Sequence, residues 1–396
     1  MTDFLIEALE HFTYTQTLRR DFHIHPELGF KEVRTGGIVA RELESLGLEV
    51  TKGVGRTGVV GLLEGAKPGP TLLVRFDMDA LPILEETGAE YASQNHGVMH
   101  ACGHDGHTAV GLTVARMLHT HRNELSGTIK FVFQPAEEMV GDEGLGGAET
   151  MIRDGVLDSP RPDHALALHL WNEKPLGWLG IAKGPVMAGA ELFNVKVTGK
   201  GGHGAVPNAT IDPVLAAAQI VTALQSIVSR NVSPMDTAVV SVTSMHGGTA
   251  FNVIPQQIKM EGTIRSFDLD VREKILRRFE QIVRGVAEAM GCSAEIEIKR
   301  ITPAVVNDAD VAARVQESSR QVLPDADLDT DSHTTMGAED MAFMLEKVPG
   351  CFFFVGSANH ARNLDYGHHH PKFDFDEDSL PRAAALMAAA AADYLK

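Results

Sequence analysis

The stretch TLLVRFDMDALP, residues 71–82, places a continuous apolar run directly before two acidic residues. Apolar runs of this length, bounded by glycine or proline, are typical of strands that are buried on both faces. Further runs of this kind lie at residues 58–63, 129–133 and 165–170, with helical patterns at 4–20, 35–46, 108–121 and 146–154. Strands that alternate with helices predict an α/β fold with a mostly parallel central sheet.

The pattern changes near Pro185, after which residues 190–199 (AELFNVKVTG) alternate like a half-exposed strand. We expect further strands at 238–244, 257–265 and 294–299, and helices at 212–229 and 270–290. This βαββαβ order predicts a small α+β, ferredoxin-like domain. The expected organisation is a catalytic domain formed by residues 1–186 and 300–396, with an inserted domain at 187–299. In the second catalytic segment we expect a helix at 309–322, a short helix opened by Gly337, a strand at 351–355 and a final helix from 376.

The composition excludes several classes of function. Of 396 residues, 35 are Lys or Arg and 53 are Asp or Glu, which gives a net charge of −18. Such a chain repels nucleic acid and anionic membranes, so neither is an expected partner. The opening MTDFLIEALEHF carries acids where a signal peptide carries cations, and no run is long enough to span a membrane, so a cytoplasmic location is expected. Three widely spaced cysteines argue against a disulfide framework.

The segment HACGHDGHT, residues 100–108, is the densest group of metal-binding residue types. Cys102 and His104 are two residues apart and can face the same side of a turn, and thiolate and imidazole are both ligands for zinc-like ions. Two other readings stay open for this segment. It could be a polar helix start, or Cys102 could be a nucleophile with His104 as its base.

Other candidate residues follow apolar runs. Glu137 and Glu138 come after FVFQPA, Asp79 follows residues 71–76, and His169 ends ALALH. Open α/β sheets place their sites at the carboxyl ends of strands. Together these patterns place Cys102, His104, Glu138 and His169 at the carboxyl ends of strands in one sheet, with His369 or His370 on a late loop, and such a ligand set suits two divalent cations that share one crevice. Without that context, paired acids are usually solvated and a lone strand histidine usually belongs to the core.

Seven motifs in order resemble a known family: DMDALP, HACGHDGHT, FQPAEE, HGAVP, GGTAFNVIP, MGAEDMAF and HHHPKFDFDE. They are similar to those of the hippurate hydrolase, aminoacylase and indole-acetyl-amino-acid hydrolase branch of the dinuclear metallo-aminoacylase and carboxypeptidase superfamily. The resemblance extends from RRDFHIHPELGF at residue 19 over nearly the whole chain. It implies metal ligands at Cys102, His104, Glu138, His169 and His369, the last chosen because it stands two residues before Pro371, with His368 and His370 as alternatives.

The resemblance also implies roles for other residues. Glu137 matches the general acid/base and Asp79 the acid that orients a ligand. Asp77 stands where the wider superfamily has a histidine, which leaves the metal open among zinc, manganese, nickel and cobalt. The inserted domain matches a lid and dimerisation domain, so a homodimer or homotetramer is expected.

Within that domain, His203 matches a histidine that stabilises the tetrahedral intermediate, commonly from the partner subunit. Asn252 and Arg265 match residues that hold the substrate carboxylate, and Arg265 could otherwise be a solvated strand residue. Gly337 is expected to line the substrate side or to form a simple helix-cap turn. His23, His25 and Glu27 fit the family pattern and are interpreted as structural.

These observations predict an enzyme that hydrolyses N-acyl or N-aroyl amino acids with two divalent metal ions per subunit and Glu137 as the base. One alternative is a dipeptidase or carboxypeptidase of the same superfamily. The others are a thiol-dependent amidase that uses Cys102 and a binding protein that has lost catalysis. An intact Glu137 argues against the last of these.

Overall fold

The structure, a computed structural model, describes residues 3–396 and divides them into two compact units. Unit 1 comprises the residues up to Val186, Val306–His333 and Asp340–Lys396, and unit 2 comprises Met187–Val305 with Thr334–Glu339. Unit 2 begins at Met187. Its end lies past residue 299, because β13 (Ser293–Thr302) runs further than the sequence pattern indicated. The roles of catalytic domain and lid stay predictions.

Unit 1 is built on an eight-stranded sheet with the order β1-β2-β4-β3-β5-β16-β6-β15. The four central strands β4, β3, β5 and β16 are parallel to one another, which confirms the predicted α/β class. The strands are β1 (Glu49–Val54), β2 (Gly58–Glu64), β3 (Lys67–Asp77), β4 (Ser126–Gln134), β5 (His164–Pro175), β6 (Trp178–Gly180), β15 (Asp327–Asp329) and β16 (Gly350–Ala358). β2 pairs antiparallel with both of its neighbours in the sheet, β1 and β4.

The helices of unit 1 are α1 (Phe4–Glu10), α2 (Phe12–Ile24), α3 (Val33–Ser45), α4 (His104–Thr120), α5 (Gly147–Arg153), α8 (Ala309–Val322), α9 (Met341–Leu345) and α10 (Ser379–Tyr394), with 3-10 turns η1 (Arg122–Glu124) and η4 (His360–Arg362). The single helix predicted over 4–20 was wrong. The chain breaks at His11 and α2 then continues to Ile24, where Pro26 disfavours a helical residue before it.

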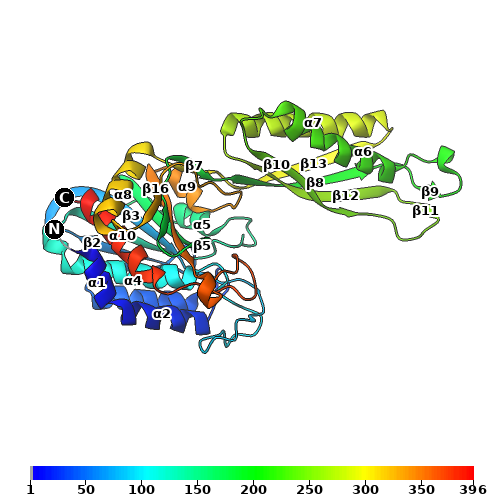
Figure 1. The fold of residues 1–396 in the computed structure, drawn as a ribbon. Helices are drawn as coiled ribbons and strands as arrows, with labels where there is room; N and C mark the ends of the chain where they lie inside the picture. The colour runs from blue at the N-terminus through cyan, green and yellow to red at the C-terminus, as the bar shows by residue number, and fades with distance from the viewer. Residues whose placement is uncertain (1–2) are drawn as a thin grey trace. The chain divides into compact units, whose positions relative to one another are not determined.

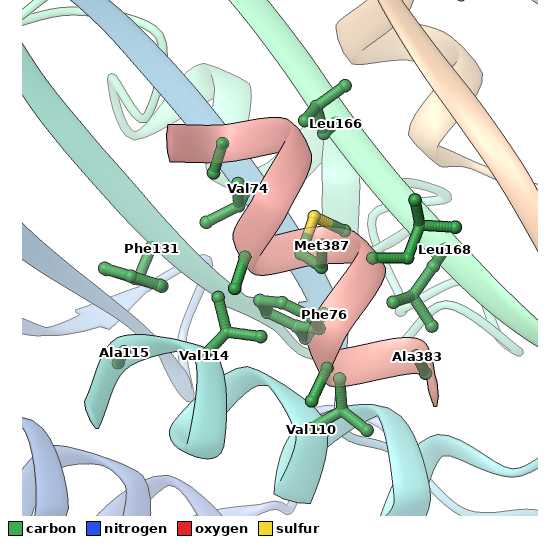
Figure 2. Close-up of a cluster of buried hydrophobic side chains, with 14 of the residues drawn as sticks. Val74, Phe76, Val110, Val114, Ala115, Phe131, Leu166, Leu168, Ala383 and Met387 are labelled. Atoms are coloured by element: carbon green, nitrogen blue, oxygen red, sulfur yellow. The ribbon is translucent and has the colours of Figure 1, made fainter. Parts of the chain in front are cut away.

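The core of unit 1 lies between the sheet and helices α4 and α10. Figure 2 shows Val110 and Val114 of α4 and Met387 of α10 facing the apolar side chains of β3, among them Phe76. Half of the residues of α10 are alanine, and small side chains let the helix approach the sheet closely. This packing holds β3, β4 and β5 in register, and their carboxyl ends carry the candidate site.

Unit 2 contains an antiparallel sheet with the order β10-β12-β8-β13, and α6 and α7 cover one of its faces (Figure 1). The rings of Phe193 and Phe279 lie 4.6 Å apart in the core between them. Its elements are β8 (Gly189–Thr198), β9 (Gly202–His203), η2 (Pro207–Ala209), α6 (Pro213–Ser226), η3 (a π-helical turn, Ile227–Asn231), β10 (Ala238–His246), β11 (Val253–Ile254), β12 (Gln257–Ser266), α7 (Leu269–Ala289) and β13; two short strands, β7 (Gly184–Met187) and β14 (Val305–Asn307), pair with each other. The βαββαβ order is therefore present.

Within residues 3–396, no helix combines the length and the apolar character needed to cross a membrane. The three cysteines are free thiols, in agreement with the predicted lack of a disulfide framework.

Candidate metal centre

The candidate residues of unit 1 gather at the carboxyl edge of the parallel strands. Asp79 lies two residues past the end of β3, Glu137 and Glu138 follow β4, and His169 lies in β5. Cys102 and His104 do not end a strand as predicted. Cys102 lies in the loop before α4, and His104 is the first residue of that helix. Gly103 between them has a φ of 92°, a conformation that glycine adopts without strain, so the chain can turn sharply between the two side chains.

Backbone groups fix the orientation of three histidines. The Leu170 amide donates to His107 Nε2 (2.9 Å), and the Leu170 carbonyl accepts from His169 Nδ1 (2.7 Å). His104 Nδ1 donates to the Asp79 carbonyl (3.0 Å). As a result, His104 and His169 each keep the lone pair of Nε2 for another partner, which is how a metal-binding histidine is usually oriented.

The five predicted metal ligands lie in two overlapping groups that share Cys102. In each group the ligand atoms are within 4.8 Å of one another; one group is Cys102, His104 and His169, and the other is Cys102, Glu138 and His369. Cys102 Sγ lies 3.5 Å from His169 Nε2, and His369 Nε2 lies 3.0 Å from Glu138 Oε1. His369 has a φ of 64°, which is uncommon for a residue with a side chain and is often found at functional sites.

This donor set fits divalent cations. Burial, together with Glu138 and Glu137, raises the pKa of the Cys102 thiol well above its usual value. Burial alone would lower the pKa of His104, but Asp77 and Asp79 outweigh it and raise that pKa to about 10, because these negative surroundings favour a positive charge, here a proton that a cation would replace. His104 Nε2 is buried and has no hydrogen-bond partner among residues 3–396. A cation would pair with the thiolate and the carboxylate and would also use this nitrogen, and the mixture of S, N and O ligands suits zinc-like ions.

The high pKa of the Cys102 thiol also bears on the thiol-amidase alternative. A nucleophilic cysteine reacts as its thiolate and needs a lowered pKa. The surroundings of Cys102 act in the opposite direction, since two carboxylates and burial favour the neutral thiol. The surroundings of Cys102 therefore do not supply the lowered pKa that a nucleophilic cysteine needs.

Asp77 is held by groups of the protein itself. Arg75 Nη1 donates to its Oδ2 (2.6 Å) and His107 Nδ1 donates to its Oδ1 (2.6 Å). Burial would raise the pKa of Asp77, but His104, His107 and Arg75 lower it well below the usual value. Asp77 stands where the superfamily that the sequence resembles has a histidine, and here it forms a buried ion pair with Arg75.

The structure distinguishes the three consecutive histidines. Only His369 shares a candidate ligand group with Glu138 and Cys102. His370 stacks on Tyr366, with ring centroids 4.6 Å apart. His368, which the sequence marked only as an alternative, places Nδ1 3.8 Å from Cys102 Sγ and accepts a hydrogen bond at Nε2 from the Asn172 amide.

Asp79 binds the turn that carries the two glutamates. Its Oδ1 accepts from the Glu137 amide (3.0 Å) and its Oδ2 from the Glu138 amide (3.0 Å). One carboxylate therefore fixes the backbone of both the candidate base and the adjacent candidate ligand.

Four predicted site residues belong to unit 2, which does not bring them together. His203 and Asn252 lie in the segment of β9 and β11, where the Gly204 amide donates to the Asn252 carbonyl (2.7 Å). Arg265 is near the far end of β12, eight residues past Gln257. A strand rises about 3.3 Å per residue, so β12 separates the two places by roughly 25 Å. Figure 1 shows β9 and β11 beyond one end of the four-stranded sheet.

Arg265 and Gly337 do lie near each other. Arg265 Nη1 donates to the carbonyl of Met336, and its Nε donates to Thr263 Oγ1. Gly337 does not open a helix as predicted: its amide donates to Thr335 Oγ1 in a turn, and α9 begins only at Met341. Burial lowers the pKa of Arg265, yet a guanidinium remains charged at neutral pH.

Known proteins resemble this chain over nearly its whole length. The model of Peptidase family M20/M25/M40 matches residues 73–393. Thermostable carboxypeptidase 1 of Saccharolobus solfataricus is 40% identical over 95% of this chain and 94% of its own length. N-acetylcysteine deacetylase of Bacillus subtilis is 38% identical over 94% of each chain. A solved Bacillus subtilis structure, described as a dinuclear metal binding peptidase of the M20 family, superposes with a TM-score of 0.85 at 35% identity, covering 98% of this chain and 99% of that one.

Proposed function

Since the chain belongs to Peptidase family M20/M25/M40 and is a hydrolase of the amidohydrolase type, we propose that it uses two divalent metal ions to cleave the amide bond of N-acyl or N-aroyl amino acids. The observation that carries the proposal is the pair of overlapping ligand groups around Cys102, with Glu137 beside them on a fixed turn. The named activity of the B. subtilis deacetylase relative supports the N-acyl amino acid class.

A bound divalent cation would polarise the amide carbonyl and make a nearby water acidic enough to react near neutral pH. The ligands proposed to hold the cations are Cys102, His104, Glu138, His169 and His369. Glu137 is the proposed general base: its carboxylate takes a proton from the attacking water and delivers one to the amine nitrogen as the C–N bond breaks. The products are a carboxylic acid and a free amino acid.

Unit 2 supplies the proposed contacts to the substrate. Arg265 donates to two neutral acceptors, Thr263 Oγ1 and the Met336 carbonyl, so its charge suits an anionic substrate carboxylate. The Ala205 amide donates to His203 Nδ1, which leaves the Nε2 proton of a neutral His203 to donate to an oxyanion. Because β12 separates His203 and Asn252 from Arg265, we propose that His203 and Asn252 serve the site of a second subunit.

The test begins with metal removal. Treatment with a chelator should abolish hydrolysis of N-acetylmethionine and hippurate, and zinc, manganese, nickel or cobalt should restore it. An enzyme that stays active after complete metal removal but loses activity on alkylation would instead be a thiol amidase.

The substrate class has a specific competitor, because a relative at 40% identity is named a carboxypeptidase. The same assay should therefore include dipeptides with a free amino group. Faster turnover of the N-acyl amino acids supports the proposal, and faster turnover of the dipeptides would assign the chain to the peptidases.

The role of a second subunit can be tested by mixing two inactive variants. Glu137→Ala and His203→Ala proteins, unfolded and refolded together, should regain activity, since a mixed dimer contains one site with both residues intact. Separately refolded variants are the control. Absence of recovery, with mixed dimers demonstrated, would place His203 in its own subunit's site or outside catalysis.

A further inference from the structure

Glu32 occupies the position that precedes α3, but its side chain does not cap that helix. The amides of Arg34 and Thr35 at the helix start donate instead to the carboxylate of Glu27, at 3.0 and 2.8 Å. A carboxylate is ordinarily placed before a helix to accept such amides. Because Glu27 already does this, the buried carboxylate of Glu32 needs another explanation.

The Glu32 carboxylate binds the turn that carries the candidate base. Its Oε1 accepts from the Ala136 amide (2.8 Å), and its Oε2 accepts from the Thr57 hydroxyl (2.5 Å). The next two amides along the chain, of Glu137 and Glu138, donate to Asp79. Three consecutive amides thus end on two buried carboxylates that come from different parts of the sequence.

The turn needs such support because its backbone is strained. Ala136 has a φ of 48°, a left-handed conformation that is unfavourable for a residue with a side chain. The other side of the turn is also closely packed: a Cβ on Gly147 would lie 1.6 Å from the Pro135 carbonyl oxygen. The turn is therefore held from two sides. The hydrogen bond from the Ala136 amide to Glu32 fixes its backbone directly before Glu137.

We propose that Glu32 is a positioning residue of the hydrolytic site, which binds the Ala136 amide and thereby fixes the turn that directs Glu137 and Glu138. This inference rests on the proposed function and extends it to a residue about one hundred positions away in the sequence. Burial and the neighbouring Asp79 raise the pKa of Glu32 to about 7. Keeping an acid in surroundings that disfavour its charge is typical of functional sites rather than of core packing.

The experiment measures zinc affinity by competition with a chromophoric chelator, and kcat and KM with zinc-saturated protein. Glu32→Ala should weaken zinc binding and lower kcat by roughly 10–100-fold each, the usual effect of losing a group that orients a metal ligand, with KM nearly unchanged. Glu32→Gln keeps an oxygen that can accept from Ala136 and should stay within a few-fold of wild type in both measurements.

Two further variants separate positioning from stability. Glu32→Asp keeps the charge but shortens the side chain by one methylene, so it should resemble Glu32→Ala in zinc affinity even if Glu32→Ala itself folds poorly. Glu27→Ala removes another carboxylate that accepts two amides, so it should lose stability while keeping zinc affinity and kcat.

These measurements distinguish failure of the proposed function from failure of the proposed role of Glu32. If wild-type protein binds no zinc or other divalent ion, the proposed function fails. If wild type binds zinc and hydrolyses N-acyl amino acids while Glu32→Ala and Glu32→Asp match it in zinc affinity and kcat, only the role of Glu32 is overturned.

Discussion

Two buried polar clusters lie on either side of the first turn of α4, and they are built differently. The Arg19 cluster comprises Arg19, His23, Asp105, Asp374 and Glu377. Its Asp105 directly follows His104 in the chain. The ligand cluster comprises Cys102, His104, Glu138, His169 and His369. The Arg19 cluster contains a permanent cation that three carboxylates surround. In the ligand cluster, the imidazoles are the only members that can carry a positive charge.

This difference indicates what each cluster is for. Arg19 Nε lies 2.9 Å from Asp105 and Arg19 Nη2 lies 2.7 Å from Asp374, so this cluster contains a cation for its own carboxylates and ties α2 to α4 and to the segment before α10. The ligand cluster is rich in donor atoms and lacks an arginine or lysine of its own. A cluster of the first kind stabilises a fold, whereas a cluster of the second kind is suited to binding a cation.

The largest expected effect is on catalysis beside the ligand cluster. Glu137→Gln should keep the turn and the five ligands but lose the proton acceptor. We expect kcat to fall by about 10²–10⁴, the usual contribution of a general base. Steady-state kinetics combined with metal analysis of the same preparation measures this. Unchanged kcat would exclude Glu137 as the base, and loss of metal would show that the variant has damaged the ligand cluster instead.

The next effect concerns stability and the Arg19 cluster. Arg19→Met removes the cation and leaves buried carboxylates without their partner, which should lower the free energy of unfolding by about 3–5 kcal/mol. Urea unfolding of the metal-free protein measures it. Arg20→Met is a matched control: Arg20 also pairs with Glu377, but its side chain is 40% exposed, so its loss should cost at most about 1 kcal/mol. Equal losses would mean that burial does not distinguish the two pairs.

The comparison also shows what could be predicted from sequence. The ligand cluster was predictable because its residues follow apolar runs at regular places or belong to dense motifs, and parallel strands bring such places to one edge. The structure agrees on the proximity of all five residues, although the exact role of each stays a prediction. The α/β class followed in the same way from the apolar runs at β3, β4 and β5.

The Arg19 cluster and Glu32 were not predictable from pattern. Arg19 and Glu377 are 358 residues apart, and a buried ion pair has the same local sequence as a solvated one. His23 was interpreted as structural, and its bond to Asp105 (2.7 Å) agrees with that. Glu32 belongs to none of the sequence motifs, and its local sequence gives it no role. Only the three-dimensional contacts show that Glu27 caps the helix and that Glu32 points to Ala136.

The smallest expected effect is a pH dependence that should have opposite signs for Asp105 of the Arg19 cluster and for Glu32, which binds the turn that carries Glu138 of the ligand cluster. Burial would raise the pKa of Asp105, but Arg19 outweighs it and lowers that pKa below the usual value. Burial and Asp79 raise the pKa of Glu32 from 4.5 to about 7. Native protein therefore holds the Glu32 proton more tightly than unfolded protein does. The stability that this proton contributes is present below about pH 4.5 and is lost as the pH rises to about 7.

Glu32→Gln removes this titration while keeping the shape of the side chain. The free energy of unfolding of Glu32→Gln relative to wild type should therefore rise between pH 5 and pH 8, by about 1–2 kcal/mol, because one pKa unit corresponds to about 1.4 kcal/mol and neighbouring groups titrate in part with it. Urea unfolding of the metal-free proteins at both pH values measures the difference. Asp105→Asn should show the reverse, a growing loss of stability relative to wild type as the pH rises through the range in which an unfolded aspartate ionises. If both variants shift in the same direction, the opposite pKa shifts of Asp105 and Glu32 do not govern how stability changes with pH.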